Sequence, residues 1–286
     1  MGSRYDPDTP RALARSYDRD EAPFPRATDI VVPDRRPTRE EVHHLHCLFF
    51  PRLWNAGDRV GDLAAIEECL SGLGDLFVIG IRAYDRDPSV IVPAVLDRIP
   101  EIRETLKKDV VAAYKGDPAA KSYREVIRSY PGFHALLIHR VAHALYEAGA
   151  PEYARELSES AHSETGIDIH PGAEIGEYCF IDHGTGVVIG ETATVGEWAR
   201  IYQNVTLGAL HFEEAEDDEH MLRKGYKRHP DVGDHVVIGA GSNVMGPIEV
   251  GDHVSIGANA WISEDVPDHT AVFIADHPDL EQKPTD

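Results

Sequence analysis

One pattern constrains the fold of this chain more than any other feature: branched apolar residues recur every six residues after Gly166. They form two blocks, at Ile169, Ile175, Ile181, Ile189, Val195, Ile201 and Leu207, and at Val232, Ile238, Val244, Val250, Ile256 and Ile262. An amphipathic α-helix has a period of 3.6 residues and a half-buried strand a period of two, so neither explains this spacing. A six-residue period is typical of a parallel β-helix, in which successive coils stack and bury one ladder of apolar side chains.

The repeat is interrupted twice. The step from Ile181 to Ile189 is eight residues, so two extra residues must leave the coil beside His183, within the sequence Asp-His-Gly-Thr-Gly. Between Leu207 and Val232 the sequence is too long for one turn of the coil and must loop out. Breaks in a repeat are common places for binding and chemistry, so we expect the functional site beside them.

Before Gly166 the pattern is helical. Apolar residues recur at spacings of three and four between about Pro37 and Ser163, and Pro or Gly separates the segments. Thr38 followed by Glu41 is a capping-box signature for the first helix. We therefore predict an α+β chain with four parts: a flexible polar arm at 1–36, a helical domain at 37–165, a β-helix at 166–270 with a loop insertion at 209–230, and a tail at 271–286.

The composition narrows the classes of partner. Acidic residues number 50 against 28 basic residues, a net charge of -22, which argues against nucleic acid or an anionic membrane as the main partner. The sequence lacks an apolar run long enough for a membrane span, and its first residues lack the apolar stretch of a secretory signal. Three separated cysteines without a CxxC pair argue against a disulfide framework or a zinc ribbon, so we expect a cytoplasmic protein.

Five stretches carry a family resemblance: GFHALLIHRVAHALYEAG, DIHPGAEIG, DHGTGVVIGETATVG, QNVTLG and KRHP. They resemble motifs of the serine O-acetyltransferases, within the hexapeptide-repeat acyltransferase superfamily, over about Lys107 to Pro267. The resemblance implies an N-terminal helical domain followed by a left-handed parallel β-helix. It also implies transfer of acetyl from acetyl-CoA to the hydroxyl of L-serine, giving O-acetylserine and CoA, the first step of cysteine biosynthesis.

By this resemblance His183 is the catalytic base and Asp168 is the carboxylate that partners it. The chemistry agrees, because a serine hydroxyl is a poor nucleophile that needs a base, and imidazole is suited to this task near neutral pH. A carboxylate on the far ring nitrogen fixes the tautomer and stabilises the imidazolium. Asp168 lies fifteen residues before His183, so the two could face each other one coil apart if a coil is about three hexapeptides.

The resemblance also implies the substrate contacts. Asp117 and Asp182 match the acids that hold the serine amino group, and Arg228 and His229 match the pair that receives its carboxylate. The residues predicted to contact coenzyme A are Gly208, Ala209, Ala240 and Ala258. A simpler interpretation stays open for two of the predicted serine contacts. Asp117 beside Pro118 could be a turn or helix cap, and Arg228 could be a solvated loop charge.

The sequence departs from the family pattern in three places. Gly208-Ala209-Leu210-His211 replaces the usual Gly-Gly-Thr-Gly, so one family contact is missing. The usual stretch resembling AGVPARIVG is absent near the C-terminus. The sequence ends in Asp286, where the family has an Ile that enters cysteine synthase; burying the extra carboxylate unpaired would be costly, so we expect no tight complex with that enzyme. The family implies a homotrimer or a dimer of trimers, with CoA between neighbouring chains.

Other functions stay open at this point. The chain could be another CoA-dependent hexapeptide acetyltransferase with a different hydroxyl acceptor, or a scaffold in which the Asp168–His183 pair is idle. A metalloenzyme like the γ-type carbonic anhydrases would use several histidines, and the candidates are His183, His211, His220 and His229. Their spacing does not resemble that motif, and the cluster at 43–47 lies on a predicted helix, so we predict no metal.

Overall fold

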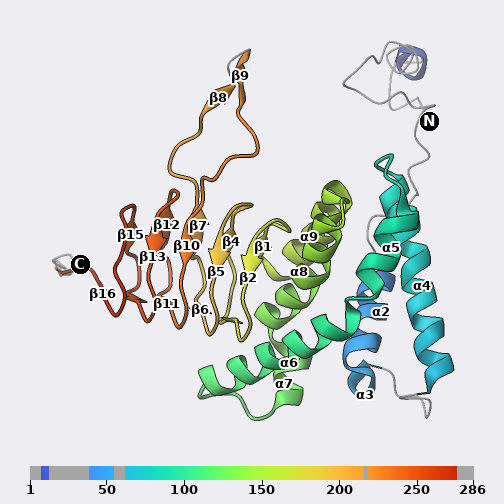
Figure 1. Cartoon of the computed structure of the whole chain (residues 1–286), viewed down its shortest axis with the longest axis horizontal. Helices are drawn as coiled ribbons and strands as arrows, with labels where there is room; N and C mark the ends of the chain where they lie inside the picture. The colour runs from blue at the N-terminus through green and yellow to red at the C-terminus, as the bar shows by residue number, and fades with distance from the viewer. Residues whose placement is uncertain (1–7, 13–38, 55–61, 216–217, 276–286) are drawn as a thin grey trace, which may run out of the picture.

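The computed structural model describes residues 8–12, 39–54, 62–215 and 218–275. Helices fill the first half of this part of the chain and short parallel strands fill the second half, which confirms the predicted fold class (Figure 1). Most of the expected polar arm lies outside the described residues, as do Thr38 of the expected capping box and 276–286 of the expected tail. No helix of the described part combines the length and the apolar character that a membrane crossing requires.

The helices are bounded by residues that favour their ends. They are α2 Arg39–Phe49, α3 Pro51–Trp54, α4 Leu63–Arg82, α5 Pro88–Leu96, α6 Ile99–Gly116, α7 Tyr123–Ser129, α8 Pro131–Glu147 and α9 Pro151–Thr165. The side chains of Asp62, Asp87 and Ser122 each accept a backbone N–H in the first turn of α4, α5 and α7. The last helix ends at Gly166, whose φ of 71° is easy for glycine, and the six-residue period begins there.

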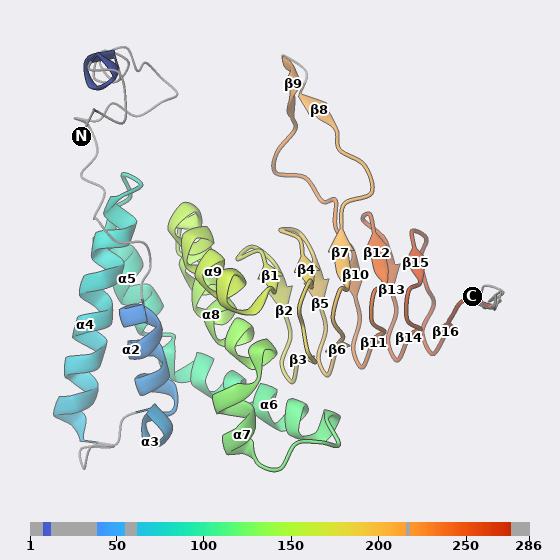
Figure 2. The same cartoon turned by 180° about the vertical axis from the view of Figure 1, so that it is seen from behind.

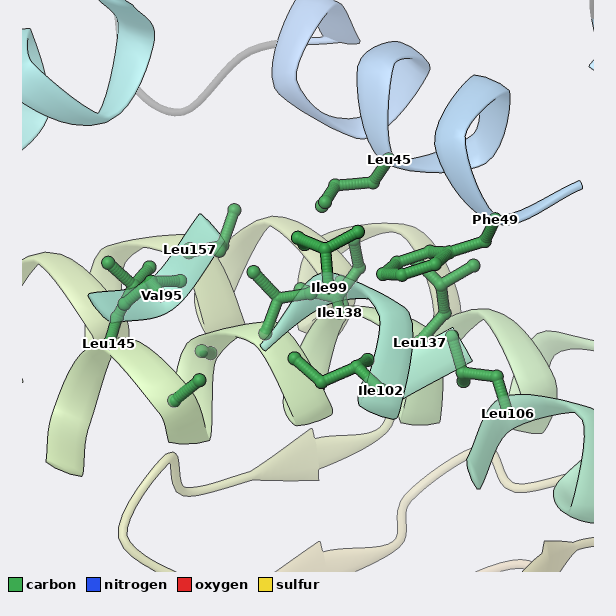
Figure 3. Packing of buried hydrophobic residues seen from close by; sticks show 14 of the residues in the cluster. Leu45, Phe49, Val95, Ile99, Ile102, Leu106, Leu137, Ile138, Leu145 and Leu157 are labelled. Atoms are coloured by element: carbon green, nitrogen blue, oxygen red, sulfur yellow. The ribbon is translucent and has the colours of Figure 1, made fainter. Parts of the chain in front are cut away.

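A buried core joins these helices (Figure 3). Its fully buried members include Leu45 and Phe49 from α2, Leu106 from α6 and Leu137 from α8. Because apolar burial stabilises roughly in proportion to the area removed from water, this core makes the helical half a firm support for the strands that follow.

A buried ion pair and a glycine attach the helices to the first coil. Arg140 of α8 contacts both carboxylate oxygens of Asp109 of α6, at 2.7 and 2.9 Å, and donates to the carbonyls of Ile175 and Gly176 at 3.0 and 2.9 Å. Gly132, at the start of α8, lies so close to the strand below that a Cβ there would be 2.0 Å from the carbonyl oxygen of Ile181. These contacts fix where the α6–α7 connection sits relative to the residues after that strand.

The strands of the second half form a prism with three parallel faces. Face A contains β1 Asp168–Ile169, β4 Val188–Ile189, β7 Thr206–Gly208, β12 Asn243–Met245 and β15 Trp261–Ile262. Face B contains β2 Glu174–Ile175, β5 Thr194–Val195, β10 Asp231–Val232 and β13 Glu249–Val250. Face C contains β3 Phe180–Ile181, β6 Arg200–Ile201, β11 Val237–Ile238, β14 Ser255–Ile256 and β16 Ala271–Val272.

The register of these faces confirms the six-residue period. Val188 pairs with Thr206, and Asn243 pairs with Trp261, so one coil contains three hexapeptides. Every residue of the predicted apolar ladder is buried except Ile175, which is partly buried at the joint with the helices. The ladder therefore forms the core of the prism, as the period predicts.

Both interruptions of the repeat lie where the spacing placed them. Asp168 pairs with Val188, two residues beyond the usual coil length, and the extra residues fall in the turn that contains His183, Gly184 and Gly186. All three have φ between 59° and 78°. The long interruption leaves the coil after β7 and rejoins it at β10. It contains an antiparallel hairpin of β8 Glu214–Ala215 and β9 Asp218–Leu222 that projects from the prism (Figures 1 and 2).

Three corners separate the faces. The His183 corner, between faces C and A, comprises residues 182–187, 202–205, 239–242 and 257–260. The Arg228 corner, between faces A and B, comprises residues 170–173, 190–193, 209–215, 218–230 and 246–248. The third corner carries a stack of aromatic rings from residues whose backbone is in the left-handed region. They are Tyr178, Trp198, His235, His253 and His269.

Candidate active site

The extra residues at the first interruption expose His183. Its side chain is 71% exposed, and its Nε2 atom lies 3.9 Å from Oδ1 of Asp182. The backbone reaches this position through a φ of 59°, with flexible glycines at 184 and 186 completing the turn. The imidazole is therefore held at an accessible corner of the prism, where a substrate can reach it.

The α6–α7 connection brings Asp117 to the same corner. Its carboxylate accepts the backbone N–H of Ala119 at 2.7 Å and the hydroxyl of Tyr130. These two hydrogen bonds, led by that from Tyr130, lower the pKa of Asp117, and the nearby charge of His183 lowers it further. Burial and the hydrogen bond to Asp117 raise the pKa of Tyr130. Asp117 is the C-cap residue of α6 and its side chain closes the turn that follows, as the simpler interpretation has it, and it is also a charged neighbour of His183.

Asp182 differs from Asp117 in its electrostatics. Burial raises the pKa of Asp182, the positive charge of His183 works against this rise, and the charge of Asp117 adds to it. The corner therefore holds two carboxylates that repel each other beside one imidazole. A cationic group placed between them would relieve that repulsion.

The structure does not bring Asp168 into contact with His183. Asp168 lies on β1, and its Oδ1 forms an ion pair with Arg155 Nη1 of α9 at 3.0 Å. Among the described residues, no hydrogen bond or ion pair joins Asp168 to His183. The β1 residue pairs instead with Val188, five residues beyond the histidine. The orienting role of Asp168 stays a prediction.

One group of side chains could hold a metal ion among the described residues. Ligand atoms of Glu159, His162 and Asp168 lie within 4.8 Å of one another. The guanidinium of Arg155 already pairs with Glu159 and Asp168, so a metal ion would have to displace a cation that is in place. None of the four histidines weighed for a metalloenzyme belongs to this group.

The Arg228 corner is made from the end of the insertion and the turn after β4. Arg228 Nη2 contacts Glu191 Oε2 at 2.5 Å, and the Tyr146 hydroxyl donates to the other oxygen of Glu191 at 3.1 Å. Burial alone would raise the pKa of Glu191, but the hydrogen bonds from Arg228 and Tyr146 outweigh it and the pKa is lowered. Arg228 is only 19% exposed, so it is a fixed cation of this corner and not a freely solvated loop charge.

His229 beside it is neutral with a defined tautomer. Burial, followed by the charge of Arg228, lowers the pKa of His229 to about 4. Its Nδ1 accepts the backbone N–H of Thr192 at 3.1 Å, so the proton of the neutral ring is on Nε2. Gly190 makes room for this ring, because a Cβ there would lie 2.1 Å from it. His229 therefore offers an N–H donor next to the Arg228 cation.

Several of these neighbours carry no signal in the sequence. Glu191 and Thr192 stand in an ordinary turn of the repeat, and their contacts with residues 36 and 37 positions later depend on the length of the insertion. Tyr130 and Tyr146 belong to helices whose placement on the coils the period does not encode. A resemblance drawn from short motifs identifies the predicted site residues and misses the residues that hold them.

The two corners lie at opposite ends of face A. Equivalent points on the two corners, such as Gln203 and Ala209, are one hexapeptide apart, or roughly 20 Å at the rise of a β-strand. Asp117, Asp182 and His183 lie at one corner, and Arg228 and His229 at the other. A molecule the size of an amino acid cannot touch both sets within one chain.

The residues predicted to contact coenzyme A divide in the same way. Ala240 and Ala258 lie at the His183 corner, whereas Gly208 and Ala209 lie at the Arg228 corner. At the His183 corner the register stacks His183, Gln203, Ala240, Ala258 and Ile274 at equivalent positions. With strands about 4.8 Å apart, Ala258 is roughly 14 Å along the axis from His183. The Gln203 Oε1 atom is buried here without a hydrogen-bond partner among the described residues.

Two family models match this chain. The model described as "Serine acetyltransferase, N-terminal" matches residues 84–137, which cover α5, α6 and α7 and reach into α8. The model described as "Bacterial transferase hexapeptide (six repeats)" matches residues 229–264, within the coils that follow the insertion. The matches fall on either side of the His183 turn.

Curated relatives are similar to this chain over about three fifths of its length. A serine acetyltransferase of Synechococcus elongatus is 52% identical over 179 residues, which are 63% of this chain and 56% of that relative. The chain thus matches little more than half the length of that protein. A serine acetyltransferase of Mycobacterium tuberculosis is 49% identical over 167 residues, 58% of this chain and 68% of the relative.

Solved structures extend the similarity to almost the whole fold. Serine acetyltransferase 1 of Entamoeba histolytica, in complex with L-cysteine, is similar with a TM-score of 0.79 and 45% identity, over 92% of this chain and 96% of the other. The serine acetyltransferase of Neisseria gonorrhoeae, in complex with serine, is similar with a TM-score of 0.57 and 29% identity, over 82% and 96% of the two chains.

Proposed function

This chain belongs to the serine acetyltransferase family of acyltransferases, and we propose that it transfers the acetyl group of acetyl-CoA to the hydroxyl of L-serine. The products are O-acetylserine and CoA. The observation that carries the proposal is the division of charge between the two corners of face A. One corner presents carboxylates and an exposed imidazole, and the other presents a cation and an N–H donor, which together match the two charged ends of a zwitterionic amino acid.

In the proposed mechanism His183 acts as the base. Its ring accepts the proton of the serine hydroxyl while the hydroxyl oxygen attacks the thioester carbonyl carbon. The tetrahedral intermediate collapses by breaking the carbon–sulfur bond, and the imidazolium returns the proton to the departing thiolate of CoA. The 71% exposure of His183 leaves room for both substrates at the ring.

The serine ammonium group binds between Asp117 and Asp182 in this proposal. Burial, and after it the charge of Asp117, raises the pKa of Asp182, so a bound cation is favoured by both carboxylates. Asp117 is held in place by Tyr130 and Ala119, which leaves its charge directed at the corner. An acceptor without an amino group would leave this pair of carboxylates uncompensated.

The serine carboxylate binds at Arg228 and His229. A carboxylate can accept from the guanidinium and from the Nε2–H of the neutral imidazole. Glu191 accepts from Nη2 of Arg228 and the carbonyl of Tyr226 accepts from its Nη1 at 3.3 Å, so these contacts orient the guanidinium and leave its other N–H groups for the substrate. The neutral state of His229 keeps it a donor of fixed tautomer across the physiological pH range.

Because these groups lie at opposite ends of face A, the proposed site needs two chains. A threefold arrangement about an axis along the prism would place the His183 corner of one chain against the Arg228 corner of the next. The divided contacts to coenzyme A fit the same arrangement, with Ala240 and Ala258 from one chain facing Gly208 and Ala209 from its neighbour. A trimer therefore has three complete sites, and two trimers can pair through their helices without changing them.

Coenzyme A is proposed to follow the His183 corner along the axis. Gly239 precedes Ala240, and a Cβ there would lie 2.6 Å from the backbone nitrogen of Ala258, so these coils are bare of large side chains. The unpaired Oε1 of Gln203 lies between His183 and Ala240 and suits an amide N–H of the pantetheine arm. The thioester then lies near His183 and the nucleotide lies toward the C-terminal coils.

Asp168 enters this proposal as the residue that orients His183. Its carboxylate is part of an ion pair with Arg155, so the role requires the imidazole to turn toward β1 and share that carboxylate. Replacement of Asp168 by Asn then lowers turnover less than loss of His183, because it perturbs orientation and leaves the base in place.

A thiol-release assay tests the proposed function. Acetyl-CoA is offered with L-serine, with hydroxy acids that lack the amino group, with serine amide and with sugars. We expect release of CoA with L-serine and little with acceptors that lack either charged group. Equal rates with serine and with a sugar would refute the assignment of the two corners.

A further inference from the structure

The hairpin β8–β9 is a structured projection that the repeat does not require. The backbone N–H of Arg223 donates to the carbonyl of Glu213 at 2.8 Å, and the two side chains form an ion pair. The hydroxyl of Tyr226 accepts the N–H of Glu213 at 2.9 Å. These contacts brace the two arms of the insertion, so it projects as a defined element from the Arg228 corner.

The hairpin carries an unusual share of exposed apolar surface. Phe212 is 60% exposed, Met221 is 50% exposed and Leu222 is 48% exposed. With Glu191 and Arg228 they line a hollow of about 560 Å³ at the foot of the hairpin. Three large exposed apolar side chains beside Arg228 are typical of a protein–protein contact surface.

The rest of the same chain does not cover them. The hairpin leaves one edge of the prism, while the α6–α7 connection lies at another edge, next to β3 and β6 (Figures 1 and 2). Within the described residues the hairpin strands pack mainly on each other, and both views show the hairpin away from the helices (Figures 1 and 2). Any helical surface that meets the hairpin must belong to another chain.

The α6–α7 segment, residues 114–124, has the complementary character. Tyr114 and Tyr123 are exposed and meet edge to face, with ring centroids 4.8 Å apart. Lys121 and Arg124 are exposed, and neither forms an ion pair within the described part of the chain. The hairpin and the residues beside it offer apolar side chains and the exposed carboxylate of Glu214 on β8, which match these rings and cations.

We propose that the hairpin of one chain packs on the α6–α7 segment of a second copy and closes the serine pocket over Asp117 of that copy. The inference rests on the two-chain site of the proposed function, which sets the root of one hairpin, at Arg228, beside the neighbour's Asp117. The apolar side chains of the hairpin are then buried against Tyr114 and Tyr123. Glu214 lies opposite Lys121.

Disulfide trapping tests the contact without reference to activity. Glu214→Cys and Lys121→Cys are introduced together, with Cys47→Ser and Cys69→Ser to remove the partly exposed native thiols. We expect oxidation to link chains into a covalent ladder that ends at the trimer, and each variant with one engineered cysteine to stay monomeric on a denaturing gel. A trimer by light scattering that forms no covalent ladder would refute the contact while leaving the proposed function intact.

Substitution of the apolar side chains gives a second readout. The triple change Phe212→Ser, Met221→Ser and Leu222→Ser should raise KM for serine roughly tenfold and leave KM for acetyl-CoA unchanged, because only the acceptor pocket loses its cover. Val90→Ser, at an exposed apolar residue of α5, is the control and should change neither. An unchanged KM for serine in the triple variant would overturn the closing role.

Discussion

The His183 corner and the Arg228 corner border the same face of the same prism, yet they are built in opposite ways. Two extra residues make the first, and the side chain of His183, the proposed base, is exposed and has few partners of its own. A long insertion makes the second, and its side chains are already satisfied by Glu191 and Thr192. The difference supports the proposed roles of the two corners. The exposed His183 corner reacts with the substrates, and the rigid Arg228 corner binds the serine carboxylate.

The strongest test of this contrast removes the reactive group. His183→Asn should lower kcat by at least about 10²-fold, the usual scale for loss of a general base. Asparagine is the substitution of choice because His183 has a φ of 59°, and Asn tolerates that conformation. Steady-state kinetics by thiol release give the comparison.

His253→Asn is the matched control for that change. His253 has a φ of 56° and lies at the third corner, in the ring stack away from both substrate clusters. It should leave kcat near that of the parent protein. If the two variants lost turnover equally, the effect would come from the backbone and not from the base.

Loss of the receptor cation should have the next largest effect. Arg228→Ala should raise KM for serine by roughly 30-fold or more, since a charge-assisted partner of the carboxylate is lost, with a much smaller change in KM for acetyl-CoA. Lys227→Ala provides the control, because Lys227 is a neighbouring cation that pairs with Asp231. Equal rises in the two KM values would remove Arg228 from the acceptor site.

The two aspartates of the His183 corner should separate binding from stability. Asp117→Asn and Asp182→Asn should each raise KM for serine several-fold, because each removes a charge that faces the ammonium group. Their effects on stability should have opposite signs. The folded-state pKa of Asp117 is lowered, so its charge stabilises the fold above the ordinary aspartate pKa, and that stability is lost as pH falls through the lowered value.

For Asp182 the effect of the charge on stability has the opposite sign. Its folded-state pKa is raised, so the protonated form stabilises the fold at low pH and this contribution is lost as pH rises through the raised value. At neutral pH Asp182→Asn should therefore raise the Tm, whereas Asp117→Asn should lower it. Thermal unfolding at pH 7.5 without substrates checks both, and a fall in Tm for both variants would contradict the assigned electrostatics.

The smallest expected effect concerns the shape of the rigid corner. Gly190→Ala should destabilise the fold by about 1–3 kcal/mol and raise KM for serine modestly, because the new Cβ must push the His229 ring aside. Gly225→Ala is the comparison, since no atom lies near its Cβ position and only its φ of 73° opposes the change. Urea unfolding distinguishes the two variants. An unchanged free energy of unfolding and an unchanged KM for serine in Gly190→Ala would show that the His229 ring is not tightly held.

The sequence predicts more of the first corner than of the second. The six-residue period identifies the buried ladder, and its break at Ile181–Ile189 locates the exposed His183 without any other information. The resemblance adds Asp117, which the structure does place beside His183 although 66 positions separate them along the chain. That placement depends on Gly132 and on the Asp109–Arg140 pair, whose contacts follow from helix packing and not from periodicity.

At the Arg228 corner the sequence predicts the site residues but not the side chains that contact them. The sequence predicts a loop for the insertion, because β8 with two residues and β9 with five are too short to show an alternating strand pattern. Glu191, which pairs with Arg228, stands in a regular turn and is connected to it only because the insertion returns to β10 beside β5. The sequence likewise does not show that Arg155 forms an ion pair with Asp168 and so competes with His183 for its carboxylate.

Subunit complementation tests the central claim, that each site takes one corner from each of two chains, most directly. His183→Asn and Arg228→Ala proteins, each nearly inactive alone, are mixed in equal amounts, unfolded in urea and refolded together. Random assembly into trimers should restore about a quarter of the parent activity, because one interface in four then joins an intact His183 corner to an intact Arg228 corner. Activity that stays at the sum of the two variants, in trimers shown to contain both chains, would contradict the account.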